Sequence, residues 1–80
     1  MAKKVLIKIS GPRVQGVGFR FESYQMFAEL NLTGKAENGR DGSLEVEAEG
    51  EEANLEKFVE WAKKGPVGAR VAMVDVKDAA

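Results

Sequence analysis

The segment Gly11-Pro-Arg-Val-Gln-Gly-Val-Gly-Phe-Arg20 lies between a strand-like run and a helix-like run and is rich in glycine. Glycines at such a junction let backbone N–H groups converge on an anion, which the positive end of the helix dipole favours. Arg20 opposes that dipole at a cost of about 0.3–1 kcal/mol, unless an anion occupies the loop and its oxygens bind the guanidinium. The segment therefore predicts a phosphate site. The alternative is a plain glycine-rich connection followed by an arginine that faces solvent.

Two other phosphate-binding patterns do not fit this loop. A Walker loop places Lys and then Ser or Thr after its second glycine, whereas Val17 and Gly18 follow Gly16 here. A dinucleotide fingerprint that begins at Gly16 lacks its last glycine.

The residue types that are missing restrict the chemistry. The 80-residue chain contains no cysteine and no histidine. Disulfides, thiol nucleophiles, thiolate or imidazole metal sites and imidazole acid–base catalysis are therefore excluded. Carboxylates, amides, hydroxyls, cationic side chains and the backbone remain, and no metal or cofactor is expected.

The charge balance and the N-terminus bear on partners and location. The formal net charge is −1, with 12 basic and 13 acidic residues. Nucleic-acid-binding proteins usually carry a basic excess, so no nucleic-acid partner is expected. Met1 to Lys4 is too short for a secretory signal, and no stretch approaches a membrane span. A cytoplasmic protein without membrane contact is expected.

Hydrophobic periodicity predicts six elements in the order β-α-β-β-α-β. Strands are expected at residues 3–9, 34–38, 43–49 and 70–77, and helices at about 21–30 and between Glu51 and Lys64. Two helices with one apolar stripe each, over a sheet with one apolar face, indicate an α+β, ferredoxin-like two-layer sandwich. We expect an antiparallel sheet with both helices on one face, in a single domain that spans residues 1–80.

The same patterns predict which of the main charged and aromatic side chains are buried and which face solvent. The glutamates of 43–49 are expected to form a solvated sheet face, paired across strands with Lys4 and Lys8. Trp61 is expected to be partly buried beside the stripe of the second helix, and Gly65 to cap that helix in a left-handed conformation. Four aromatic residues are expected in the core around the first helix: Phe19, Phe21, Tyr24 and Phe27.

Three segments resemble the acylphosphatase family. Arg13-Val-Gln-Gly-Val-Gly-Phe-Arg20 is similar, over eight consecutive residues, to the family's substrate loop. Asn38-Gly-Arg-Asp-Gly-Ser43 resembles its Asn-x-x-Asp-Gly-Ser/Thr turn at the matching distance, and the stretch from Gly65 to Val76 resembles its closing segment. The resemblance implies an enzyme that hydrolyses the carboxyl–phosphate bond of acyl phosphates to carboxylate and inorganic phosphate.

The resemblance also implies roles for particular residues. Arg20 binds the phosphoryl group, and Asn38 orients the attacking water. The loop amides complete the phosphate-binding set: Arg13, Val14, Gln15, Gly16, Val17, Gly18 and Phe19. These residue types suit an anhydride, because its carboxylate leaving group has a conjugate-acid pKa of about 4 and needs no general acid. A phosphate monoester would normally need an acid or a metal.

Four residues and the C-terminus depart from the family pattern. Pro12 replaces a usual glycine, Phe27 a small residue, Lys35 a tryptophan and Glu37 an arginine. Glu37 is expected to weaken substrate binding by placing negative charge near the anion site. The sequence ends at Ala80, before a further short strand that family members generally have. A monomer is expected, with dimerisation through an exposed sheet edge as the alternative.

Two other functions compete with hydrolysis. Residues 15–21 superficially match the RNP1 pattern of RNA-recognition motifs, but RNP1 belongs on the third strand, and here the match precedes the first helix. The other candidate is a catalytically weak or inactive anion-binding module on the same fold.

Overall fold

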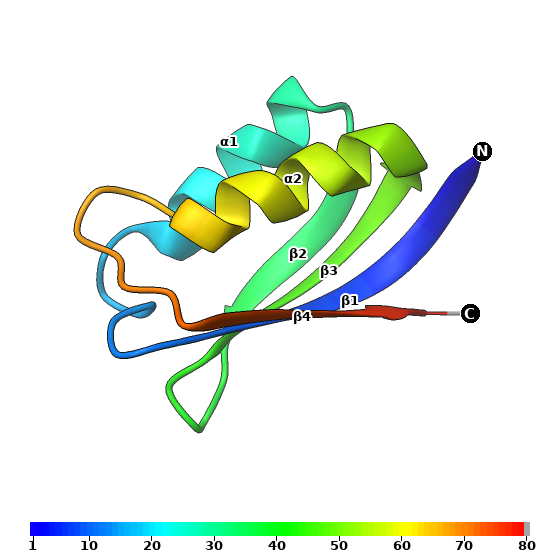
Figure 1. Ribbon diagram of the computed structural model, residues 1–80. Coiled ribbons are helices and arrows are strands. Elements are labelled where there is room, and N and C mark those ends of the chain that lie inside the picture. Colours follow the sequence, from blue (N-terminus) through cyan, green and yellow to red (C-terminus); the bar gives the residue numbers. More distant parts are fainter. Residues whose placement is uncertain (80) are drawn as a thin grey trace.

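Strand β1 (Ala2–Ser10) is central to the sheet of the computed structural model, which describes residues 1–79. The other elements are α1 (Phe19–Glu29), β2 (Thr33–Asn38), β3 (Leu44–Glu51), α2 (Glu52–Lys64) and β4 (Met73–Asp78). The strand order is β2-β3-β1-β4 and each neighbouring pair is antiparallel. Both helices cover one face of the sheet (Figure 1). The predicted α+β ferredoxin-like sandwich is confirmed; Ala80, the last residue of the predicted domain, lies outside the described residues.

The core forms where the apolar residues of β1 and β3 face the helices. The register pairs Val5 with Ala48, Ile7 with Val46 and Ile9 with Leu44, and all six side chains are buried. α2 adds its predicted stripe to this layer, with buried Leu55, Phe58 and Ala62. No helix within residues 1–79 is both long and apolar enough to cross a lipid bilayer.

Helix α1 begins two residues earlier than expected and buries fewer aromatic residues. Its start follows from Gly18, which takes a left-handed conformation (φ 79°) and accepts a hydrogen bond from the Glu22 N–H at 2.9 Å. The buried face carries Phe19, Ser23 and Phe27, which are spaced four apart. Phe21 and Tyr24 fall outside this spacing and are 68% and 46% exposed, so the prediction that all four aromatics lie in the core is wrong for these two.

The predictions for the end of α2, for Trp61 and for the start of the last strand are partly confirmed. Gly65 ends α2 with positive φ (73°), but its ψ of −175° places it outside the left-handed helical region, in a region that is essentially restricted to glycine. A Cβ at this position would lie 2.8 Å from a ring carbon of Phe19, so packing also favours glycine. Trp61 is partly buried, as predicted, and packs edge-on against Phe19 with ring centroids 5.3 Å apart. β4 starts at Met73 rather than at residue 70, and Arg70 instead pairs through its backbone with Arg13.

The turn between β2 and β3 is fixed by the Asp41 carboxylate. Its Oδ1 accepts hydrogen bonds from the Ser43 N–H (3.1 Å) and hydroxyl (2.6 Å), and its Oδ2 pairs with Lys8 Nζ at 2.8 Å. Lys8 therefore does not pair with a glutamate as expected, whereas Lys4 does, at 2.9 Å from Glu47. The hydrogen bond from Lys8, followed by those from Ser43, holds the pKa of the Asp41 carboxyl well below its ordinary value.

A carboxyl with a depressed pKa in the folded state stabilises the fold above its ordinary pKa, and this contribution is lost as the pH falls through the folded-state value. We therefore expect the urea midpoint of the wild type to exceed that of Asp41→Asn by a constant margin between about pH 5 and 8. The margin should shrink below about pH 4, near the ordinary aspartate pKa. Urea unfolding of both proteins across this range measures it, and an equal margin at pH 7 and pH 2.5 (roughly 1.4 units below that ordinary value) would contradict the role of Asp41.

Candidate active site

The loop that joins β1 to α1 owes its shape to two glycines. Gly16 and Gly18 have φ values of 76° and 79°, a region that side-chain-bearing residues rarely adopt. A Cβ at either position would meet no atom of the described chain within 4 Å, so the glycines serve the backbone conformation and not packing. Val17 between them does not have positive φ. Alternation of this kind curves the backbone into a concave nest of N–H groups that suits an anion.

This loop, the start of α1 and the end of β2 enclose a hollow of about 400 Å³. Arg20 reaches it from the first turn of α1, and Asn38 reaches it as the last residue of β2. Eight residues line the hollow: Val14, Gly16, Gly18, Phe19, Arg20, Phe21, Tyr24 and Asn38. The fold thus brings together the two residues that the sequence analysis singled out from separate motifs.

Three residues of the predicted phosphate-binding set do not line this hollow. Arg13 exchanges backbone hydrogen bonds with Arg70, which joins the loop to the segment before β4. Val17 packs against the hydrophobic core. The side chain of Gln15 turns to the β2–β3 turn, where its Nε2 donates to the carbonyl oxygens of Gly39 and Ser43.

The sequence analysis missed Phe21 and Tyr24 as lining residues of the hollow. Their aromatic character and their closeness to the buried positions of α1 predict burial in the core instead. The signal that identifies the buried face is the four-residue spacing of Phe19, Ser23 and Phe27, which requires a serine in the core. Ser23 is fully buried because its hydroxyl donates to the Phe19 carbonyl at 2.8 Å, which satisfies its polar group within the helix.

The environment of Arg20 contains few charges. Its side chain is exposed and forms no ion pair with the described residues, although Glu22 lies in the same helical turn. The guanidinium therefore keeps all its donors for a ligand. Within residues 1–79, no group of three or more acidic side chains is arranged to hold a metal ion.

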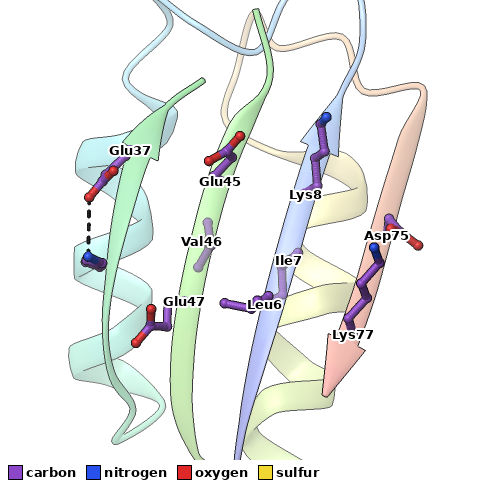
Figure 2. Close-up of a pocket in the computed structure, with 10 residues that line it drawn as sticks. Leu6, Ile7, Lys8, Glu37, Glu45, Val46, Glu47, Asp75 and Lys77 are labelled. Atoms are coloured by element: carbon purple, nitrogen blue, oxygen red, sulfur yellow. Dashed lines mark ion pairs between the residues drawn. The ribbon is translucent and has the colours of Figure 1, made fainter. Parts of the chain in front are cut away.

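Glu37 does not line this hollow, contrary to the expectation that it places negative charge near the anion site. Successive strand residues point to opposite faces, so Lys35 and Glu37 lie on the open face of the sheet while Asn38 points to the helical side. Figure 2 shows Glu37 among the charged residues of that open face. The Oε1 atom of Glu37 lies 3.5 Å from Lys35 Nζ. The shallow hollow there, of about 370 Å³, is lined by interleaved lysines and carboxylates.

Comparison with known proteins extends the likeness over nearly the whole chain. The family model described as Acylphosphatase matches residues 5–80. An acylphosphatase of Caldanaerobacter subterraneus is 45% identical over 75 residues, which cover 94% of this chain and 82% of the relative. An acylphosphatase of Acaryochloris marina is 44% identical over 70 residues, covering 88% of this chain and 74% of the relative.

Solved structures agree with these sequence relatives. The acylphosphatase of Coxiella burnetii superposes with a TM-score of 0.93 at 33% identity, covering 99% of this chain and 82% of that one. The acylphosphatase of Bacillus subtilis gives a TM-score of 0.91 at 37% identity, covering 99% and 86%. Because the family model matches from Val5 onward and relatives above 40% identity cover most of both chains, this chain belongs to the acylphosphatase family.

Proposed function

We propose that this chain hydrolyses the carboxyl–phosphate bond of acyl phosphates and releases a carboxylate and inorganic phosphate. The observation that carries the proposal is the shared hollow: Arg20 and Asn38 come from different elements and line the same space beside the glycine nest. Family membership supports the same reaction. A hollow of about 400 Å³ is large enough for a phosphoryl group and part of a small acyl group.

In this proposal Arg20 and the loop amides hold the phosphoryl group. A guanidinium presents a planar pair of donors to two phosphoryl oxygens, and the N–H groups of the loop and the first turn of α1 approach the remaining oxygens. The bound dianion offsets the unfavourable position of Arg20 at the positive end of α1. Phosphoryl transfer depends mainly on such charge neutralisation and positioning, and little on covalent chemistry by the protein.

Asn38 supplies the orientation of the nucleophile. A carboxamide is not a base at neutral pH, but its oxygen can accept a hydrogen bond from a water molecule and aim that water at phosphorus. The water oxygen forms a bond to phosphorus while the bond from phosphorus to the acyl oxygen breaks. The carboxylate leaves with that electron pair and needs no proton. The proton of the attacking water passes to a phosphoryl oxygen.

Substitution of the two proposed catalytic residues tests these roles. We expect Asn38→Ala to lower kcat by about 100-fold or more, since one oriented donor or acceptor is worth about that much. Arg20→Gln should lower kcat/KM by about 1,000-fold, the lower end of what an arginine contributes in phosphoryl transfer. It should also abolish inhibition by phosphate, because the guanidinium binds the phosphate oxygens in this proposal. The assay is hydrolysis of benzoyl phosphate with a metal chelator present.

Two matched variants control for the loss of charge and of a carboxamide. Arg40→Gln removes an arginine of the β2–β3 turn, and Asn54→Ala removes an asparagine of α2; neither residue lines the hollow. Both should stay within about threefold of wild type, as expected for surface positions. Full turnover in Arg20→Gln and Asn38→Ala would overturn the assigned roles. A wild type that binds phosphate but shows no turnover would indicate an anion-binding module instead.

The proposed proton path also predicts the pH profile. Because the mechanism uses a guanidinium, a carboxamide and backbone amides, it involves no general acid or general base of the protein. We expect kcat for benzoyl phosphate to vary less than about twofold between about pH 6 and 8. Initial rates at saturating substrate measure this, and a bell-shaped profile centred near pH 7 would contradict it.

A further inference from the structure

Two side chains tie the strand that carries Asn38 to the loop and helix that surround Arg20. Gln15 Nε2 donates to the carbonyl oxygen of Gly39 at 2.8 Å and to that of Ser43 at 3.0 Å. On the other side, the Ala36 N–H donates to the hydroxyl oxygen of Tyr24 at 3.0 Å. The anchored backbone positions, Ala36 and Gly39, lie on either side of Asn38 in the sequence.

These bonds matter because β2 is an edge strand. It pairs with β3 along one side only, so the second row of its backbone groups has no strand partner within the described residues. The Tyr24 hydroxyl takes the place of such a partner for Ala36. Without these contacts, the backbone around Asn38 would be held only along one side, by the pairing of β2 with β3 and by the bond from Gly39 N–H to Ser43 O. The ends of edge strands are where a sheet opens most readily.

Gln15 acts at the point where β2 enters the turn. The carbonyl oxygen of Ser43 accepts hydrogen bonds from the Gly39 N–H, at 2.8 Å, and from the Gln15 side chain. Gln15 therefore bonds the residue at each end of the turn, Gly39 and Ser43. Asp41 holds the far side of the same turn through Ser43. The peptide group between Gly39 and Arg40, one residue beyond Asn38, is therefore held from within the loop that precedes α1.

We infer that Gln15 and Tyr24 are positioning residues for hydrolysis: together they fix the backbone on both sides of Asn38 against the structure that holds Arg20. This inference rests on the proposed function. The water that Asn38 orients and the phosphorus that Arg20 binds have to meet within a narrow range of distance and angle, and an error of about 1 Å can cost about 100-fold in rate. The hydrogen bonds of both side chains act through the backbone around Asn38.

The test uses substitutions that remove only the hydrogen-bonding groups. Gln15→Met keeps the length of the side chain, and Tyr24→Phe removes one oxygen. We expect kcat for benzoyl phosphate to fall by about 10- to 100-fold in Gln15→Met and by about 3- to 10-fold in Tyr24→Phe, within the range that misplacement allows. The inhibition constant of phosphate, which reports on the loop and Arg20, should change less than about twofold, as expected where uniform binding is kept. Gln25→Met, on the exposed side of α1, is the matched control and should retain wild-type kcat.

A double-mutant cycle with Asn38→Ala separates positioning from general stabilisation. If Gln15 and Tyr24 act through Asn38, either substitution should cost less than about twofold once Asn38 is already alanine, because residues that act as a unit are not additive. The same factors in both backgrounds, or a phosphate inhibition constant that rises in step with the loss of kcat/KM, would overturn the inference.

The remaining outcomes are also decisive. Normal kcat in Gln15→Met and Tyr24→Phe, with Asn38→Ala impaired, would overturn this inference and leave the proposed function intact. No turnover in the wild type would overturn both. If Gln15→Met does not fold, as judged by urea unfolding, Tyr24→Phe still decides the matter, because its side chain is 46% exposed and keeps its ring.

Discussion

The antiparallel register between β1 and β3 is the constraint on which the site depends. It places Ile9 opposite Leu44, so the loop that leaves β1 and the turn that enters β3 emerge at the same end of the sheet. The register is well specified, because a shift of one residue would turn the buried apolar residues of the shifted strand to the solvent. Arg20 and Asn38 belong to separate motifs, and this pairing makes them neighbours of one hollow.

Charged side chains have different surroundings on the open face of the sheet and beside the glycine-rich loop. On the open face, lysines and carboxylates interleave and neutralise one another, and solvent screens such exposed pairs so that they contribute little to stability. At the glycine-rich end, Arg20 has no carboxylate partner within residues 1–79 and lies at the positive end of a helix. A free guanidinium beside backbone donors attracts an anion, whereas the paired face has no such preference.

The placement of Asn38 on an edge strand connects function to stability. An edge leaves one side of the backbone open to side chains from other elements, and Tyr24 uses that opening at Ala36, while Gln15 bonds the turn that follows β2. The β2–β3 turn is in turn held by Asp41, which links Ser43 to Lys8 on the central strand. The chain on both sides of Asn38 thus receives contacts from α1, from the glycine-rich loop and, through Asp41, from β1.

The sequence by itself determined the order of elements, the buried faces of β1, β3 and α2, and the place of the glycine-rich loop between the first strand and the first helix. These features are encoded locally: alternation and helical spacing show which side chains need burial, and glycine at Gly16 and Gly18 indicates backbone that other residues avoid. The motifs around Arg20 and Asn38 could be identified in the same way, because each lies within a few consecutive residues.

Only the tertiary structure decided which side of α1 is buried and where the polar side chains find partners. Apolar residues of α1 lie on several sides of the helix, so packing selects which side is buried. Phe21 and Tyr24 lie beside the hollow as a result. The choice of Asp41 as the partner of Lys8, and the two carbonyl oxygens bound by Gln15, join residues 24 to 33 positions apart. Such contacts depend on how the strands and loops are placed in space, and no local pattern of residue types records that placement.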